Sequence, residues 1–299
     1  MKGIAIYGNT KQDAYLPRIA RFLHTLEYHG VTLYVEGRFS EYLRRGGVYG
    51  RWEVRQAFPA EDVDRVVSLG GDGTFLRCAR WVAYHATPIL GINTGHLGFL
   101  ASYSFDEMDE LVHILLGGLG RIEPRMVLRV ESNCLPDGVW PYALNEVAIL
   151  KSDSSSMLDI CTWIDGNYLA DYLADGLLVA TPTGSTAYNL SVGGPILDPT
   201  VSNMVLSPVA PHSLTMRPLV VGGDSQVAVA VSSKAHRCRI SLDGLAFSMP
   251  CIQEGETAQP ALSITKAGFA VNILRRPESH FSDILRNKLM WGRGLISKS

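Results

Sequence analysis

Short apolar runs alternate with helical patterns along the first hundred residues. Apolar positions three and four residues apart predict a helix from about residue 16 that ends near Gly30, and a second helix from about 74 to 85. Strands are expected at Ile4–Tyr7, Val31–Val35, Val66–Leu69 and Ile89–Ile92. Strands that alternate with helices in this way are typical of a parallel sheet covered by helices.

The segment from residue 37 to residue 59 interrupts this alternation. It holds many charged residues and glycines without clear periodicity, so we interpret it as a long loop. Beyond the fourth strand, Ser104 and Glu107 have the spacing of a capping box and predict a helix that ends near Gly117.

From about Met126 the chain changes to strand-like segments separated by turn residues, which predicts a mostly β domain. These segments are Val127–Val130, Ala143–Leu150, Met157–Ile164, Gly176–Ala180, Val227–Val231 and Arg239–Leu242. Near the end, Ile284, Leu285 and Leu289 have helical spacing. We therefore predict an α/β domain at 1–102, a β-rich domain at 103–271, and a C-terminal segment at 272–299 that packs back on the first domain.

Composition limits the kinds of partner. The chain has 299 residues, 46% of them hydrophobic, which is enough for one large or two ordinary domains with buried cores. Its formal net charge of -2 provides no general attraction to nucleic acid or to anionic lipid. Five cysteines without a C-x-x-C pair argue against a disulfide framework and a zinc knuckle. With no signal-peptide core or membrane span in the sequence, we expect a cytoplasmic protein without nucleic-acid or membrane partners.

The strongest candidate for chemistry is Gly70-Gly71-Asp72-Gly73-Thr74, which lies between a predicted strand and a predicted helix. Glycines let backbone amides approach a phosphate closely, and the start of a helix adds partial positive charge. Arg77, one turn further on, is either a phosphate ligand or a solvated helix charge. The alternative for the whole motif is a tight turn in which Asp72 only caps the helix.

Two further segments combine glycine with small polar residues after a strand. Asn93–Leu100 is either part of a binding site or a connecting turn with buried apolar side chains. In Asp175–Ser191, Thr183 or Ser185 can cap a short helix whose free amides bind a phosphate or a ribose, and Tyr188 offers a ring on which a base can stack. The alternative for this segment is a capped turn with a core tyrosine.

Asn145 and Glu146 interrupt the strand pattern of residues 143–149. Two polar side chains need hydrogen-bond partners if they are buried, so they are either ligand contacts or surface residues.

These motifs together resemble those of a known family. The GGDGT motif resembles one that NAD kinases, phosphofructokinases and diacylglycerol kinases share, and therefore indicates a kinase without naming the acceptor. The stretches N-x-G-x-L-G-F-L at 93–100 and D-G-x-x-x-x-T-P-T-G-S-T-A-Y at 175–188 are similar to NAD kinases, as are Asn145-Glu146 and the C-terminal segment 285–292. The chain is identified as a member of the NAD kinase family.

The resemblance implies a fold and a reaction. The first domain should be phosphofructokinase-like, and the enzyme should transfer the terminal phosphate of ATP to the 2'-hydroxyl of the adenosine ribose of NAD. Mg²⁺ should accompany ATP, although no metal ligand is assigned. A homo-oligomer, dimer or tetramer, is expected. Polyphosphate as donor, NADH as acceptor and inhibition by NADPH stay open.

The resemblance also assigns roles to residues. Asp72 is the candidate general base. The expected NAD contacts are Asp72, Gly73, Asn145, Glu146, Asp175, Thr186, Ala187, Tyr188, Asn189, Leu190 and Ser191. The expected phosphate contacts are Gly70, Gly71, Gly73, Thr74 and Arg77. The chain departs from the family at Leu173, where many members have a basic residue, and at Leu245, near a position where some have glutamine; both put details of the NAD contacts in doubt.

Two other functions fit parts of the pattern. A sugar or lipid kinase would share the GGDGT motif, but it would not need Asn145-Glu146 or the segment around Tyr188. A non-catalytic NAD-binding regulator would keep those segments but would not need the acid at Asp72.

Overall fold

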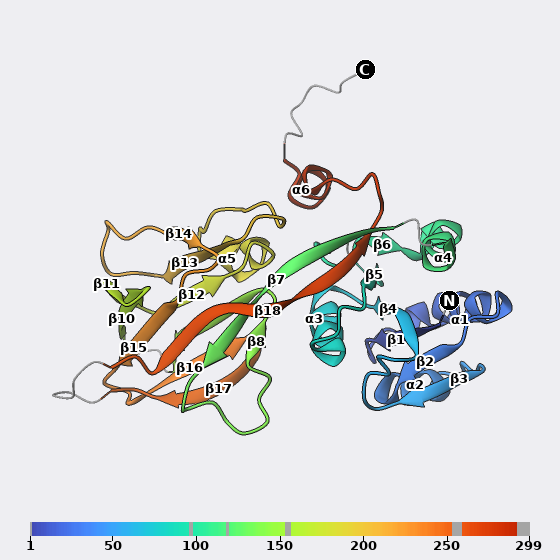
Figure 1. Cartoon of the computed structure of the whole chain (residues 1–299), viewed down its shortest axis with the longest axis horizontal. Coiled ribbons are helices and arrows are strands. Elements are labelled where there is room, and N and C mark those ends of the chain that lie inside the picture. Colours follow the sequence, from blue (N-terminus) through green and yellow to red (C-terminus); the bar gives the residue numbers. More distant parts are fainter. Residues whose placement is uncertain (1, 96–97, 118–119, 153–156, 253–258, 292–299) are drawn as a thin grey trace, which may run out of the picture. The chain divides into compact units, whose positions relative to one another are not determined.

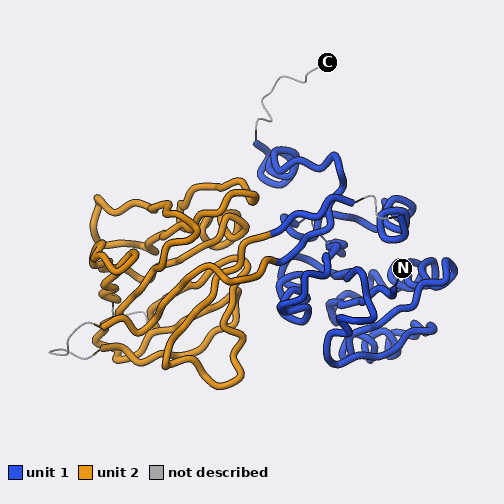
Figure 2. Tube along the Cα trace, in the orientation of Figure 1, with its two compact units in different colours: residues 1–124, 271–299 blue, residues 125–270 orange. Residues whose placement is uncertain are grey.

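The computed structural model describes residues 2–95, 98–117, 120–152, 157–252 and 259–291. The chain forms two compact units (Figures 1 and 2): unit 1 comprises residues 1–124 and 271–299, and unit 2 comprises residues 125–270. Two long strands, β7 (Arg121–Glu131) and β18 (Leu262–Arg275), have one end in each unit.

Unit 1 is built on a parallel sheet with the order β5-β4-β1-β2-β3. The strands are β1 (Gly3–Gly8), β2 (Leu33–Glu36), β3 (Trp52–Arg55), β4 (Val63–Leu69) and β5 (Ile89–Asn93). The outer edge of β5 pairs with the short β6 (Tyr103–Ser104) and, at Ile273, with the end of β18. Because all these strands run in parallel, the loops after β1, β4 and β5 emerge at the same edge of the sheet.

Helices cover both faces of this sheet. These helices are α1 (Leu16–Tyr28), α2 (Gly37–Arg45), α3 (Asp72–Val82) and α4 (Met108–Gly117), with single 3-10 turns η1 (Asp13–Tyr15) and η2 (Phe105–Glu107); α6 (Phe281–Leu289) follows near the end of the chain. One core cluster joins α1, α2 and α4 to one face of the strands. Phe75 of α3 lies against Gly91 of β5 on the other face, where a Cβ would come within 3.0 Å of the ring. Strands buried on both faces explain the continuous apolar runs in the sequence.

The prediction of a long loop at residues 37–59 is wrong. The segment forms α2 and then β3, and β3 pairs with β2 over Leu33–Glu36. Phe39, Tyr42 and Leu43 are buried at helical spacing, but the charged residues around them obscured the period. Glu36 also caps α2, since its carboxylate accepts a hydrogen bond from the Phe39 N–H at 2.9 Å.

The other helices of unit 1 follow the predicted pattern with shifted ends. α3 begins two residues earlier than expected, at Asp72, and ends at Val82 because Ala83 has a φ of 56°. The predicted capping box is confirmed: Ser104 accepts from the Asp106 N–H, and Glu107 accepts from the Ser104 N–H. No helix in the described part of the chain is long and apolar enough to span a membrane.

Unit 2 is mostly antiparallel β structure. One sheet has the order β14-β13-β12-β9-β16-β17, and β11-β10-β15 continue with the first part of β18. The strands are β8 (Tyr142–Ala143), β9 (Glu146–Lys151), β10 (Leu158–Ile164), β11 (Asn167–Ala174), β12 (Gly176–Ala180), β13 (Asn203–Val209), β14 (Leu219–Gly222), β15 (Val227–Ser232), β16 (Arg237–Leu242) and β17 (Leu245–Pro250). After β12 the chain forms one 3-10 turn, η3 (Gly184–Thr186), and one short helix, α5 (Tyr188–Ser191).

A single core cluster fills unit 2. It draws buried side chains from both groups of strands, such as Ile149 and Val179 from one and Ile160 and Val229 from the other. The predicted fold class, an α/β domain followed by a mostly β domain with a C-terminal helix, is therefore confirmed.

Candidate active site

The glycine-rich turn after β4 has the shape that the sequence predicted. Gly70 has a φ of 147°, and a Cβ at that position would lie 2.5 Å from Oγ1 of Thr74. Glycine is therefore required at position 70 by both the backbone and the close approach. At Gly71 a Cβ would meet nothing within 4 Å, so the backbone at the start of α3 is open to a ligand.

Asp72 does not cap the helix it begins. Its carboxylate accepts three backbone hydrogen bonds from the segment after β5: Oδ2 from Phe99 at 2.8 Å, and Oδ1 from Leu100 and Ala101, both at 3.0 Å. A Cβ on Gly98 would lie only 2.0 Å from Oδ1 of Asp72. The Asn93–Leu100 segment is thus more than a connecting turn, because it fixes the direction of this carboxylate. His96 and Leu97 of that segment lie outside the described residues.

Arg275 holds the same segment from its carbonyl side. This arginine is 2% exposed and lies at the end of β18. Its guanidinium donates to the carbonyl of Phe99 at 2.7 Å and to Oγ of Ser102 at 2.6 Å. The backbone that positions Asp72 is therefore fixed on both sides by charge-assisted hydrogen bonds.

A buried glutamine links the three loops at this edge of the sheet. Gln12, in the loop after β1, is 6% exposed. Its Nε2 donates to the carbonyl of Leu69 at the end of β4, at 3.4 Å, and its Oε1 accepts from the hydroxyl of Thr94, after β5, at 2.6 Å. These bonds hold the loops after β1, β4 and β5 in one arrangement.

Arg77 lies at the exposed side of the α3 N-terminus. Its guanidinium donates to Oγ1 of Thr74 at 3.1 Å. Thr74 itself is buried, whereas Gly73 and Arg77 are exposed. The cation is thus held one turn from the open glycine backbone.

In unit 2, Asn145 and Glu146 lie where β8 gives way to β9. The carboxylate of Asp243 accepts hydrogen bonds from three successive N–H groups there, those of Leu144 at 2.6 Å, Asn145 at 2.8 Å and Glu146 at 3.1 Å. On the other side, Thr181 donates its N–H to the carbonyl of Asn145 at 2.8 Å and its hydroxyl to the carbonyl of Leu144 at 2.6 Å. Asn145 is 9% exposed, so the alternative of a surface pair does not hold for it.

Glu146 is a carboxyl group in an unfavourable place for a charge. Burial, together with the nearby charge of Asp243, raises its pKa to about 8, although a hydrogen bond from the Tyr188 backbone N–H acts in the opposite direction. Its Oε2 is covered and has no hydrogen-bond partner among the described residues. Groups with such a perturbed pKa and an unmet hydrogen bond gather at functional sites.

The turn after β12 differs from the predicted capped helix. Thr183 precedes η3 but makes no side-chain cap bond, and the hydroxyl of Ser185 donates to the carbonyl of Pro182 at 2.6 Å. The helix that follows, α5, has only four residues. The expectation that Thr183 or Ser185 caps a helix is therefore wrong, because the Thr183 hydroxyl accepts a hydrogen bond from the Arg125 guanidinium at 3.2 Å and the Ser185 hydroxyl bonds within the turn.

Two members of this segment differ sharply in exposure. Asn189 is fully buried; its side chain donates to the carbonyls of Ser185 and Pro195 and accepts from the hydroxyl of Ser207. Only its backbone is left for the predicted NAD contact. Tyr188, in contrast, is 37% exposed, so the alternative of a core tyrosine does not hold.

Asp175 and the two departures from the family are also placed within unit 2. Asp175 forms an ion pair with Lys151, with Nζ and Oδ1 2.7 Å apart. Leu173 is 46% exposed and lines a cavity of about 550 Å³ that Asp159, Lys234 and His236 also line. Leu245 begins β17 and is 36% exposed.

Family models match both units of the chain. The ATP-NAD kinase N-terminal domain matches residues 4–118, and the ATP-NAD kinase C-terminal domain matches residues 144–249. The chain belongs to the ATP-NAD kinase family. An NAD kinase of Bacteroides fragilis is 42% identical over 96% of this chain and 97% of its own length. An NAD kinase of Porphyromonas gingivalis is 40% identical over 98% and 99%.

Solved structures show the same fold. An NAD kinase from Archaeoglobus fulgidus in complex with ATP has a TM-score of 0.68 and 27% identity, and the match covers 98% of each chain. A yeast NADH kinase complexed with NADH has a TM-score of 0.83 at 22% identity, covering 100% of this chain and 90% of the yeast chain. At that identity the second likeness concerns the fold alone.

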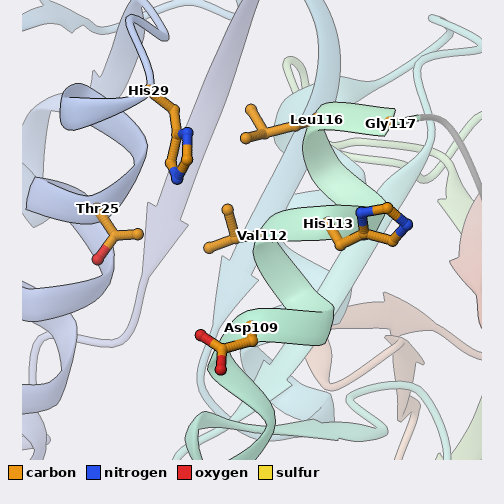
Figure 3. Close-up of a pocket in the computed structure, with 7 residues that line it drawn as sticks. All are labelled: Thr25, His29, Asp109, Val112, His113, Leu116 and Gly117. Carbon is orange, nitrogen blue, oxygen red and sulfur yellow. The ribbon is translucent and has the colours of Figure 1, made fainter.

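Other features of unit 1 lie apart from the family's motifs. A pocket of about 400 Å³ lies between α1 and α4. In Figure 3, Val112 and Leu116 point toward α1 and His113 is turned away from it. It is lined by Thr25, His29, Asp109, Val112, His113, Leu116 and Gly117. None of these is a predicted site residue. Across the described residues, no three histidine, cysteine, aspartate or glutamate side chains gather as a metal site.

Four residues with clear roles in the site geometry were missed by sequence reasoning: Gln12, Lys151, Asp243 and Arg275. Arg275 could have been found from the sequence, because it is a charged residue at the end of a long, mostly apolar strand, and the structure shows that it is buried. Asp243, followed by a glycine, has the form of an ordinary turn and gave no warning.

Proposed function

We propose that this protein is an ATP-dependent NAD kinase, which transfers the γ-phosphate of ATP to the 2'-hydroxyl of the adenosine ribose of NAD and yields NADP and ADP. Full-length similarity to NAD kinases supports the reaction. The observation that carries the chemistry is the Asp72 carboxylate, held by three backbone amides at the first residue of α3.

Asp72 is the general base of this proposal. Phosphoryl transfer passes through a loose transition state, so the protein contributes mainly by positioning and by balancing charge. The oxygen of the ribose hydroxyl bonds to the γ-phosphorus, the bond to the β-phosphate oxygen breaks, and the hydroxyl proton passes to Asp72. Such proton transfer contributes about 10²- to 10⁴-fold to the rate.

The start of α3 is the proposed phosphate site. The open backbone at Gly71 and the amide of Gly73 provide N–H donors with the partial positive charge of a helix start. The Thr74 N–H donates to the Gly71 carbonyl at 2.8 Å, so a phosphate contact of Thr74 falls to its side chain. Gly70 provides the turn, and Arg77 provides a full positive charge one turn along the helix. These groups suit phosphates whose negative charge is spread over several oxygens.

Magnesium enters this scheme with ATP as part of the substrate. Mg²⁺ is commonly bound by one or two carboxylates together with waters and substrate phosphates, without a cage of protein ligands. The described residues fit that mode, since they hold no cluster of three potential ligands, and substrate phosphates and waters would make up most of the coordination. When bound with ATP, the ion would supply charge neutralisation on the phosphates, and the residues of α3 would orient them.

Unit 2 supplies the proposed NAD contacts. Asn145 and Glu146 bind ribose hydroxyls, and Asp175, Thr186, Ala187, Leu190, Ser191 and the backbone of Asn189 contribute further polar and apolar contacts around the dinucleotide. The exposed ring of Tyr188 stacks on a base. The buried, unmet oxygen of Glu146 supports a hydrogen-bonding ligand at this place.

Replacing Tyr188 with alanine should weaken NAD binding by about 1 to 3 kcal/mol, the usual scale of base stacking on an aromatic ring. Isothermal titration calorimetry with NAD measures the change. Tyr168→Ala is a matched control, because this tyrosine is also exposed, at 59%, and lies on β11 of the same unit. Equal NAD affinities for wild type and Tyr188→Ala would rule out the stacking contact.

One assay tests the proposed function itself. Purified protein is incubated with ATP, Mg²⁺ and NAD, and NADP is measured with an NADP-specific dehydrogenase. Formation of NADP with equal ADP supports the proposal. ADP formed only with a sugar or lipid acceptor would identify another kinase of the GGDGT group, whereas NAD binding without any NADP would identify a regulator.

We also propose a homo-oligomer, dimer or tetramer, in the cytoplasm. The family resemblance supports assembly, and the five free cysteines accord with a reducing compartment. Light scattering coupled to size-exclusion chromatography measures the assembly; a monomer at micromolar concentration would rule it out.

A further inference from the structure

We propose that Asp243 is a positioning residue of the NAD site, which acts through the backbone of Leu144–Glu146 to set the directions of the Asn145 and Glu146 side chains. The inference rests on the NAD-binding role proposed for these two residues. It adds a residue that has no contact with the reacting atoms and that lies almost a hundred positions away in the chain.

The hydrogen bonds of Asp243 go to groups that the sheet does not satisfy. Leu144 and Asn145 lie between the end of β8 at Ala143 and the start of β9 at Glu146. Their N–H groups therefore have no place in a strand ladder, and buried N–H groups need a partner. One carboxylate supplies it for both of them and for Glu146.

The turn around Asp243 does not require an acid. Asp243 and Gly244 connect β16 to β17 as a two-residue turn with φ values of 48° and 81°. Asparagine or glycine would serve as well at the first position of such a turn. The need for a carboxylate therefore comes from its three bonds to the Leu144–Glu146 backbone.

The opposite side of this backbone is fixed too. Thr181 donates to the carbonyls of Leu144 and Asn145, and the N–H of Asp243 donates to the carbonyl of Glu146 at 3.2 Å. Gly184 packs so closely that a Cβ on it would lie 2.0 Å from the Asn145 carbonyl oxygen. With both sides of the backbone held, the side chains of Asn145 and Glu146 leave it in set directions.

A negative charge on Asp243 is energetically unfavourable at this place. A carboxylate here is therefore more easily explained by its role in the NAD site than by the turn alone. It lies near Glu146 and helps to raise the pKa of that carboxyl. Two neighbouring carboxylates are unfavourable, and a neutral hydrogen-bond acceptor would avoid the repulsion. A neutral side chain, however, offers fewer acceptor positions for three successive N–H groups.

The chain contains a matched control for the turn. Asp165 and Gly166 connect β10 to β11 with φ values of 51° and 77°, and the N–H of Asp165 donates to the carbonyl of Gln226, just before β15, at 2.9 Å. The Asp165 carboxylate accepts the Gln226 N–H at 2.7 Å. Both aspartates thus stabilise a hairpin, but only Asp243 holds the predicted NAD residues.

The test compares Asp243→Asn and Asp243→Gly with Asp165→Asn and Asp165→Gly in the full-length protein. Asparagine and glycine both tolerate the positive φ, so neither change strains the turn. We expect Asp243→Gly to raise the KM for NAD by about tenfold or more, with kcat within about threefold of wild type and the KM for ATP unchanged. Asp243→Asn keeps part of the bonding and should show a smaller rise. The Asp165 variants should lower thermal stability only.

Two outcomes would overturn the inference: an unchanged KM for NAD in both Asp243 variants, or an equal rise in the Asp165 variants. If Asp243→Gly does not fold, Asp243→Asn decides alone. Calorimetry with NAD is measured in parallel, because it needs no turnover. If the wild-type protein binds NAD but makes no NADP, the proposed reaction is wrong. The role of Asp243 is then decided by comparing the NAD dissociation constants of wild type and the Asp243 variants.

Discussion

Replacing Asp72 with asparagine is expected to reduce kcat by at least about a hundredfold while the KM for NAD stays close to wild type. The amide has nearly the same shape, but it cannot accept the hydroxyl proton. Its oxygen can keep the two bonds that Oδ1 now makes to Leu100 and Ala101, and only the bond to the Phe99 N–H is lost. The protein should therefore fold, and the loss should lie in turnover. Initial rates of NADP formation over a range of NAD concentrations measure it.

The control for this variant is Asp64→Asn. Asp64 lies on β4, the strand that leads into the glycine-rich turn, but it is exposed, and its carboxylate accepts a hydrogen bond from the N–H of Lys2. Its replacement should leave kcat unchanged. Wild-type turnover in Asp72→Asn would exclude Asp72 as the base. A large drop in thermal midpoint together with the rate would instead show that the carboxylate serves mainly to hold residues 99–101.

The local motifs of the site could be predicted from the sequence because each of them lies within a short segment of the chain. The glycine that a positive φ demands at position 70, the aspartate after it and the helix that follows are all neighbours in the chain. The same holds for the capping box at Ser104 and Glu107. In each case the residues that interact are within a few positions of one another, so their spacing alone carries the information.

The parts that escaped prediction depend on partners far away in the chain. Arg275 reaches Phe99, and Asp243 reaches Asn145, so neither role follows from local spacing. α2 escaped for another reason: its buried positions are separated by charged residues, and a nine-residue helix gives few repeats for a period to be recognised.

Glu146 provides a prediction in which stability and function move in opposite directions. Its pKa is raised from an ordinary value near 4.5 to about 8 in the folded protein. Between these values the unfolded chain has released the proton while the folded protein retains it, so the free energy of unfolding falls as the pH rises. Below about pH 4.5 the group is protonated in both states, and above about pH 8 it is ionised in both, so the loss is confined to this window.

Glu146→Gln removes the titrating group and nearly keeps its shape. We expect the thermal midpoint of the variant to match wild type near about pH 5 and to exceed it increasingly up to about pH 8. The corresponding gain in the free energy of unfolding at about pH 8 is on the order of 4 kcal/mol. The same variant should raise the KM for NAD with little change in kcat, because a ribose contact that is equally strong in the ground and transition states affects binding alone. Melting curves at several pH values and initial rates measure the two effects.

Glu131→Gln is the control, since that carboxylate is exposed and pairs with Arg129 at the surface. A pH-independent difference in midpoint would show that Glu146 is not held protonated by burial. An unchanged KM would show that Glu146 only braces the end of β9.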